Sequence, residues 1–262
     1  MALINRMELI MKIYVVAHKK FNVPSEEIYI PVKVGQAQLS FEQGVSDDTG
    51  ENISHLNDTF CEMTALYWIW KNANIMPGEI VGMVHYRRYF KSEKGNFPIS
   101  KDEINSIFGN YDILLPKKRN YYITTVENHY KKAHYWKDMQ AVKNILSETN
   151  AEYLPYFEKM LSSKKVCLFN MFITKEHIFN AYCDWVFPIL IELEKRIDRR
   201  MYDKYQNRVI GFIAERLFNV WILKNNNLNV KYVPVYNSEG ESFIDKGIGF
   251  IKRQYFSKQE LS

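Results

Sequence analysis

The stretch His85-Tyr86-Arg87-Arg88 is the part of the sequence best suited to binding an anion. It follows directly on the apolar run 80–84, whose β-branched composition is typical of a buried strand. Two guanidinium groups at a strand end can bind a diphosphate bidentately and stabilise charge on a departing group. The alternative is that only one arginine turns inward and the other pairs with a surface carboxylate.

Glu215 is the second candidate for chemistry. It lies in the segment 208–222, which is apolar on more than one face and is therefore expected to form a largely buried helix. A carboxylate there must be paired or take part in chemistry, and burial would raise its pKa toward that of a general base. Gly211, one turn earlier, is expected to leave space in front of it. The alternative is a structural ion pair with Arg208 or Arg216.

A polar set near one predicted helix start is suited to binding a nucleobase, ribose or sugar, because helix N-termini favour anions. Its members are Asn52, Ser54, Asn57 and Glu62. Capping of the helix is the alternative explanation for Ser54 and for Asn57. The helical spacing is expected to run from this cap past residue 70 and to stop at Asn72.

Metal and disulfide chemistry have little support in the sequence. His129, His134 and Asp138 have a spacing that permits metal binding, but a surface position is the expectation for them. The three cysteines are widely spaced, fit neither a disulfide framework nor a zinc motif, and indicate a reducing cytosol. No metal ligand is assigned.

Apolar runs alternate with helical patterns along the 262 residues, which predicts one α/β domain over 1–262. We expect a mostly parallel central sheet flanked by helices on both faces. Ligands bind such sheets at the carboxyl ends of strands, where the segments 18–20 and 85–88 are both expected. The predicted strands are 12–18, 80–84, 111–116, 166–173 and 230–235, and the predicted helices are within 125–160, from 174 to about 198, and 208–224.

Charge and hydropathy narrow the classes of partner. The net charge of +5 suits a phosphate-bearing ligand or an anionic membrane surface, and no basic run points to nucleic acid. No apolar run approaches the ~20 residues of a transmembrane helix, so a cytoplasmic protein is expected, with peripheral contact at the inner membrane surface allowed. Residues 1–11 form an N-terminal extension, and the glycine- and charge-rich residues 237–262 are interpreted as a flexible closing flap. The sequence leaves the oligomeric state open.

Taken together, these segments resemble the DUF4422 family of bacterial capsule and exopolysaccharide glycosyltransferases. The resemblance covers most of the chain in order. The matching stretches are KIYVVAHKK (12–20), TGENISHLNDTFCEMTALYWIWKN (49–72), GMVHYRRYF (82–90), YDILLPKKRNY (111–121), NMFITKEHIFNAYCDWVFPILIELEKRI (170–197) and RVIGFIAERLF (208–218).

The resemblance implies a GT-A-like, Rossmann-type fold and transfer of a hexose, galactose in pyranose or furanose form, from a UDP-sugar to a lipid-linked glycan. The DxD signature that usually holds Mn²⁺ or Mg²⁺ in this fold is missing, and residues 82–88 stand in its place. Metal dependence therefore stays open, with Arg87 or Arg88 as the substitute for the cation. No other cofactor is expected.

The resulting hypothesis is an inverting displacement in which Glu215 is the base and His85, Arg87 and Arg88 stabilise the departing UDP. The alternatives are a non-catalytic nucleotide- or carbohydrate-binding scaffold of a polysaccharide assembly complex, and a nucleotide-sugar hydrolase. The expected donor-binding residues are Ala17, His18, Lys19, Asn52, Ser54, Asn57, Glu62, His85 and Tyr86, and the expected sugar or acceptor contacts are Asn170 and Arg216.

Overall fold

The computed structural model describes residues 9–35, 37, 39–41 and 44–240. Most of the predicted extension 1–11 and of the predicted flap 237–262 lies outside the described residues. Among the helices that are described, none combines the length and hydropathy needed to cross a bilayer.

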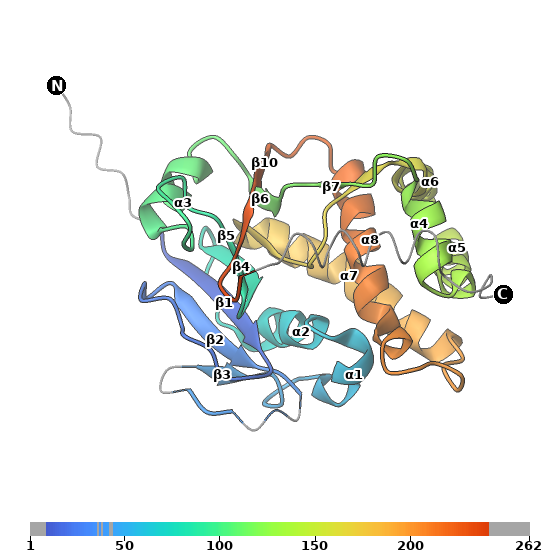
Figure 1. Cartoon of the computed structure of the whole chain (residues 1–262), viewed down its shortest axis with the longest axis horizontal. Helices are drawn as coiled ribbons and strands as arrows, with labels where there is room; N and C mark the ends of the chain where they lie inside the picture. Colours follow the sequence, from blue (N-terminus) through green and yellow to red (C-terminus); the bar gives the residue numbers. More distant parts are fainter. Residues whose placement is uncertain (1–8, 36, 38, 42–43, 241–262) are drawn as a thin grey trace.

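The centre of the molecule is a sheet with the strand order β10-β6-β9-β4-β1-β2-β3 (Figure 1). Every neighbouring pair along this order is parallel except those of β9, which runs antiparallel to both β4 and β6. The predicted mostly parallel sheet is confirmed. The strands are β1 (Met11–Ala17), β2 (Tyr29–Lys33), β3 (Val45–Ser46), β4 (Ile80–His85), β6 (Ile113–Pro116), β9 (Phe172–Lys175) and β10 (Val230–Val233).

Short hairpins extend this sheet at its carboxyl edge. The chain turns after β4 at residues 86–87 and returns as β5 (Arg88–Phe90), which pairs antiparallel with β4 and with β11 (Val235–Asn237). A separate two-stranded ribbon joins β7 (Arg119–Asn120) to β8 (Lys165–Val166).

Both faces of the sheet are buried, because alternate residues of each strand enter different hydrophobic cores. Tyr14 and Val16 of β1 face a large core with α2 and α5 to α8, whereas Ile13 and Val15 face a smaller core with α3 (Figure 1). Helices therefore cover both faces, as predicted. The helices are α1 (Asn57–Phe60), α2 (Met63–Asn72), α3 (Lys101–Phe108), α4 (Val126–Ala133), α5 (Trp136–Thr149), α6 (Leu154–Ser162), α7 (Glu176–Arg196) and α8 (Val209–Lys224).

The predicted helix from residue 54 to residue 72 is interrupted, although it ends at Asn72 as expected. Cys61 adopts a φ of 53°, which separates α1 from α2. Ser54 does not cap α1, because it begins a 3-10 turn and its hydroxyl donates to Asp47 Oδ1 at 2.7 Å. The apolar periodicity continues across the break, which is why the sequence pattern does not reveal it.

The predicted strand 166–173 is also divided. β8 ends at Val166 and β9 begins at Phe172, with a turn between them in which Phe169 and Asn170 have φ values of 82° and 48°. These left-handed conformations cannot be part of a strand. The apolar composition of the run is equally compatible with a buried turn, and this turn becomes part of the candidate site.

Gly82 gives a test of the central packing. A Cβ at this position would lie 2.7 Å from Ile173 Cγ1 and 2.9 Å from the Phe172 carbonyl oxygen. Because that carbonyl belongs to β9, Gly82→Ala must move the backbone and is expected to lower the free energy of unfolding by about 1–3 kcal/mol. Urea unfolding measures the change. The matched control is Gly109→Ala. A Cβ on Gly109 would lie 3.5 Å from the Ser106 carbonyl oxygen, an ordinary contact, so this variant is expected to change the free energy of unfolding by less than about 0.5 kcal/mol. Equal unfolding midpoints for the two variants would contradict this account.

Candidate functional site

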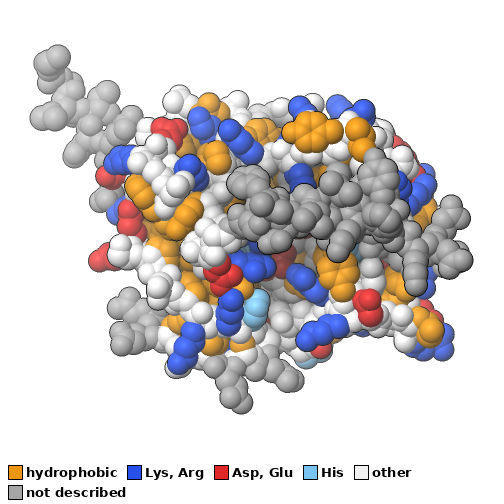
Figure 2. Space-filling view, viewed as in Figure 1, with side chains coloured by type: hydrophobic (Ala, Val, Ile, Leu, Met, Phe, Trp, Pro, Cys, Tyr) orange, Lys and Arg blue, Asp and Glu red, His pale blue; other side chains and the backbone are white. Residues whose placement is uncertain are grey.

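Segments far apart in the sequence converge at the carboxyl edge of the parallel strands. β1 and β4 run side by side with Val16 opposite His85, so the residues after both strands meet. The turn between β8 and β9, the α1–α2 junction and the first half of α8 close the site from the other side. Lys and Arg side chains, with a histidine among them, gather on this face of the molecule (Figure 2).

His85 connects β4 to the β8–β9 turn. Its Nε2 donates to the Phe169 carbonyl oxygen, which fixes the neutral ring in that tautomer. Burial lowers the pKa of His85 to about 4. The imidazole is therefore neutral near pH 7, and in this structure His85 serves as a hydrogen-bond donor to the β8–β9 turn.

Arg88 lies above the same turn. Its guanidinium carbon is 4.5 Å from the centre of the Phe169 ring, a cation–π distance. Its Nε is buried and has no hydrogen-bond partner among the described residues. Burial and the neighbouring Arg87 lower the pKa of Arg88 from its usual range. A guanidinium held in this way has an unused donor, so it is prepared to bind an anion.

Glu215 projects from α8 into the site, with 17% of its side chain exposed. Its Oε1 accepts the Phe169 N–H at 2.7 Å, and its Oε2 accepts from Arg216 Nη1 at 2.8 Å. Burial raises the pKa of Glu215, while the Arg216 guanidinium and the Phe169 N–H oppose that rise. The carboxylate is largely but not fully buried, and it forms the ion pair with Arg216 that was the alternative expectation for this residue.

Arg216, expected to contact the sugar or acceptor, is 3% exposed. Besides Glu215, its Nη1 donates to the Phe212 carbonyl at 2.8 Å, and its guanidinium lies 5.3 Å from the centre of the Tyr130 ring. These contacts place Arg216 underneath Glu215, where it holds the carboxylate in position.

Glu62 is a second carboxylate in the same site, and it is half-buried. Asn170 Nδ2 donates to Glu62 Oε1 at 2.7 Å and to the Gly211 carbonyl at 3.1 Å, so it joins the α1–α2 junction to α8. Burial raises the pKa of Glu62, and the charge of Glu62 in turn contributes to the raised pKa of Glu215. Two coupled carboxylates with raised pKa values are typical of catalytic sites. Asn170 Oδ1 is buried without a partner among the described residues.

The space expected in front of Glu215 at Gly211 is absent. A Cβ on Gly211 would lie 3.2 Å from both Cβ and Sγ of Cys61, because α1 packs directly against α8. Arg208 Nε lies 3.3 Å from the same sulfur. Gly211 therefore permits close packing of two helices and does not form part of a substrate cavity.

A carboxylate neutralises the cations at the rim of the site. Glu239 lies 2.7 Å from Lys19 Nζ and 3.6 Å from Arg87 Nη1. Lys19 also lies 5.1 Å from the centre of the Tyr86 ring, against which His18 packs edge-on at 5.2 Å. Burial, Arg87 and Lys19 lower the pKa of His18. The segments after β1 and β4 thus share one cationic, aromatic surface, as expected.

Three of the predicted donor-binding residues, Asn52, Ser54 and Asn57, make hydrogen bonds within the protein. Asn57 Nδ2 donates to the Cys61 carbonyl at 2.9 Å, and Asn52 Oδ1 accepts the Ser54 N–H at 3.2 Å. The Ser54 hydroxyl binds Asp47, whose side chain is fully buried. Asp47, which the sequence analysis did not single out, fixes this loop beside the site.

Two other predicted donor-binding residues, Ala17 and Tyr86, are buried. Ala17 has no exposed surface, and its carbonyl accepts the Val34 N–H at 3.2 Å. Tyr86 is 6% exposed and serves as the ring against which the cationic side chains pack.

His134 and Asp138 are buried, contrary to the expected surface position. His134 is 4% exposed and lies 3.2 Å from Gln206 Oε1, while Asp138 accepts from the Tyr202 hydroxyl at 2.6 Å. The aromatic neighbours of this helical region enclose both residues. Within the described ranges, no group of three or more His, Cys, Asp or Glu side chains is placed to hold a metal ion.

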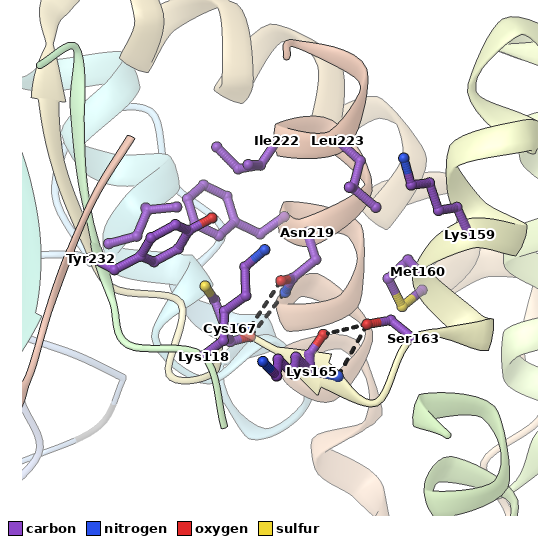
Figure 3. A pocket seen from close by; sticks show the side chains of 12 residues that line it. Lys118, Lys159, Met160, Ser163, Lys165, Cys167, Asn219, Ile222, Leu223 and Tyr232 are labelled. Carbon is purple, nitrogen blue, oxygen red and sulfur yellow. Dashed lines mark hydrogen bonds between the residues drawn. The ribbon is translucent and has the colours of Figure 1, made fainter. Parts of the chain in front are cut away.

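Asn219 supports the site from behind. It is a buried polar residue in the apolar helix α8, a signal that the sequence analysis missed. Its amide accepts the Cys167 N–H and donates to the Cys167 carbonyl, both at 2.9 Å, beside a cavity of about 80 Å³ (Figure 3). The two bonds to Cys167 tie α8 to the chain that leads into the β8–β9 turn, and a further bond to the Glu215 carbonyl, at 2.7 Å, lies within α8 itself.

The architecture is that of an α/β protein, and the candidate site lies at the carboxyl ends of its parallel strands, where ligands bind in such folds. The chain belongs to the DUF4422 family, described as a domain of unknown function, whose model matches residues 12–226. No curated protein matches the chain. Among solved structures, it is similar to the apo structure of the bifunctional glycosyltransferase WbbM, with 33% identity and a TM-score of 0.74. The match covers 89% of this chain and 46% of that one, so the chain spans less than half of its neighbour's length.

The neutral state of His85 has a consequence for stability against pH. An unfolded chain protonates a histidine near pH 6.5, whereas His85 in the fold resists protonation down to about pH 4. The contribution of neutral His85 to the free energy of unfolding is therefore complete above about pH 6.5, and it is lost as the pH falls toward 4. We expect His85→Asn, which keeps an N–H donor but does not titrate, to show a smaller loss of unfolding free energy over this range than the wild type.

Urea unfolding at a series of pH values measures this difference. His177→Asn is the matched control, because His177 is exposed, and its pH dependence is expected to follow the wild type. Parallel curves for wild type and His85→Asn would contradict the assignment of a neutral buried histidine.

Proposed function

We propose that this chain is a glycosyltransferase that moves a hexose, galactose in pyranose or furanose form, from a UDP-sugar to a lipid-linked glycan during synthesis of a bacterial surface polysaccharide. The observation that carries the proposal is the similarity to a bifunctional glycosyltransferase over 89% of this chain. The UDP-sugar donor and the galactose follow from the family resemblance. The site geometry supports chemistry that releases an anionic leaving group.

The donor diphosphate would bind at the carboxyl ends of β1 and β4. Arg87, Arg88 and Lys19 supply positive charge there, and the buried Nε of Arg88 has a donor without a partner among the described residues. Neutral His85 would hold the turn through Phe169 and leave charge neutralisation to the arginines. Stabilisation of the departing UDP by positioned donors is the main catalytic contribution that we assign to this edge.

Within residues 9–240, as far as the structure describes them, no cluster of His, Cys, Asp or Glu is placed to hold the metal that usually accompanies this fold. The carboxylates of the site already have partners within the protein. Glu62 accepts from Asn170, Glu215 accepts from Arg216 and the Phe169 N–H, and Glu239 lies against Lys19 and Arg87. The residues present therefore do not fit a site for Mn²⁺ or Mg²⁺, and no step of the mechanism is assigned to such an ion.

The reaction is an inverting displacement. The acceptor hydroxyl oxygen bonds to the anomeric carbon as the bond from that carbon to the diphosphate oxygen breaks, and UDP leaves with the electron pair. The hydroxyl proton passes to Glu215, whose pKa is raised by burial, which makes the carboxylate a stronger base. Arg216 keeps the carboxylate oriented, and Glu62 adds to the rise in its pKa.

A pair of isosteric variants tests the base. Glu215→Gln is expected to lower transfer by about 10²–10⁴-fold, because the amide cannot take up the proton, while UDP affinity stays nearly unchanged. Glu62→Gln is the comparison in the same site, and it is expected to lower turnover far less than Glu215→Gln, because it removes only a contribution to the raised pKa of the base. Release of UDP from UDP-galactose in the presence of extracted bacterial glycolipid measures transfer, and calorimetry with UDP measures binding.

Several results would contradict these assignments. If Glu215→Gln kept full activity and Glu62→Gln lost it, Glu62 would be the catalytic base instead of Glu215. A product that retains the donor's anomeric configuration, shown by NMR, would exclude direct displacement. Tight UDP binding without transfer by the wild type would favour the scaffold, and UDP-sugar cleavage that is independent of acceptor would favour a hydrolase.

Glu239 would compete with the donor. Its carboxylate occupies Lys19 and Arg87, the same cations that the diphosphate needs. Glu239→Gln is therefore expected to tighten UDP binding several-fold, with a smaller gain at high salt because the competition is electrostatic. Calorimetry with UDP measures the effect. Glu158→Gln, which removes the partner of Lys143 on α5, is the control and should leave UDP affinity unchanged. Weaker binding by Glu239→Gln would show that Glu239 assists the donor instead.

A further inference from the structure

Two adjacent apolar side chains project into solvent directly after β7. Tyr122 is 74% exposed and Ile123 is 70% exposed. Large apolar side chains exposed next to one another mark interaction surfaces more often than single ones do. Nothing in the proposed transfer chemistry uses either residue.

The backbone holds this pair outward. Tyr121, the preceding residue, is 2% exposed, and its ring stacks on His129 with 4.1 Å between ring centres. The Tyr121 N–H donates to the Lys164 carbonyl at 2.8 Å, and the Tyr122 N–H donates to Asn120 Oδ1 at 2.9 Å. Tyr122 has a φ of 56°, a conformation that tyrosine rarely adopts. An anchored turn with a positive φ thus presents two apolar side chains, which argues for a contact outside the chain.

The surface around this pair is basic. Lys118, Lys159 and Lys165 line the cavity of about 80 Å³ beside β8, and no Asp or Glu lines it (Figure 3). Lys118 Nζ also lies 5.1 Å from the centre of the Tyr232 ring. Every charged residue in the stretches 117–125 and 159–166 is a lysine or arginine: Lys117, Lys118, Arg119, Lys159, Lys164 and Lys165.

We propose that the surface formed by Tyr122, Ile123, Lys118, Lys159 and Lys165, here called the β7 surface, docks on an anionic phospholipid membrane. Tyrosine and isoleucine would enter the interfacial region, where an aromatic ring with a polar hydroxyl is favoured. The lysine ammonium groups would lie among the phosphates, with their methylene stems against the apolar boundary. Lys and Arg side chains and hydrophobic side chains lie together along the edge of the molecule over β7 and α6 (Figure 2).

Charge and shape together favour a bilayer as the occupant. The apolar pair projects outward instead of lining a groove, so it suits insertion into a fluid surface. The exposed lysines on the paired segments beside it, among them Lys118 and Lys165, match the negative potential of an anionic leaflet. The occupant to which we commit is therefore a phospholipid surface, and an acidic protein would show itself as failure of the vesicle test below.

The topology gives this contact a direction. β6 runs parallel to β4, since both are antiparallel to β9, and β7 follows β6 after two residues. The β7 surface therefore extends from the same edge of the sheet as the candidate site. Docking would turn that edge toward the bilayer, but the inference does not rest on the proposed transfer reaction, because membrane binding is measured without donor or acceptor.

Sedimentation with vesicles tests the proposal. The full chain is mixed with phosphatidylcholine vesicles that contain one third phosphatidylglycerol, and with vesicles of phosphatidylcholine alone. We expect binding to the anionic vesicles that weakens at high salt, and little binding to the neutral ones. Tyr122→Asn with Ile123→Ser is expected to lower the partition coefficient at least tenfold; asparagine tolerates the positive φ and so preserves the turn. Lys118→Glu with Lys165→Glu is expected to lower it by a similar factor.

Matched controls lie in the loop between α7 and α8. Met201 is 86% exposed and Lys204 is exposed, so Met201→Ser with Lys204→Glu changes the same chemistry at another surface. This control is expected to bind like the wild type. No binding by the wild type, or equal losses in the control and the β7 variants, would overturn the proposal. Thermal unfolding verifies that each variant is folded, and UDP calorimetry tests the donor site separately.

Discussion

The peptide groups of Phe169 are the contact on which the candidate site depends. The Phe169 N–H donates to Glu215, and its carbonyl accepts from His85, so one residue joins α8 to the end of β4. This requires a left-handed backbone at Phe169 and Asn170, a conformation that costs about 1–3 kcal/mol for a residue other than glycine. The surrounding packing must hold it, and strain of this kind is found mostly at functional sites.

The neighbouring structure can be understood as support for that turn. Asn219 makes hydrogen bonds with the N–H and the carbonyl of Cys167, which lies two residues before Phe169. Asn170 donates to Glu62 and to a carbonyl of α8. The buried charges of the site therefore belong to one connected network. Removing one member leaves another group buried without its partner, which is usually more destabilising than the loss of a single hydrogen bond.

The sequence allows the sheet, the long helices and the burial of Glu215 to be predicted, because each follows from an apolar pattern that packing has to satisfy. The break at Cys61 and the turn at Phe169 do not follow, since both lie inside apolar runs and differ from regular structure only in backbone φ. Asp47 was also missed, because its partners come from separate stretches of the chain and meet only in the fold. The family was identified from several matching segments in the same order along the chain, because each motif by itself was too short to be specific.

The antiparallel strand β9 has a consequence for how the chain reaches this structure. Strands β1, β2 and β4 can pair with one another once residue 85 has been made, but β6 joins them only through β9, at residues 172–175. During synthesis, the free side of β4 would stay unpaired while nearly 90 further residues emerge. An unpaired edge that persists in this way is open to wrong strand pairing and aggregation. The order of the strands thus prevents the sheet from closing until β9 has been made.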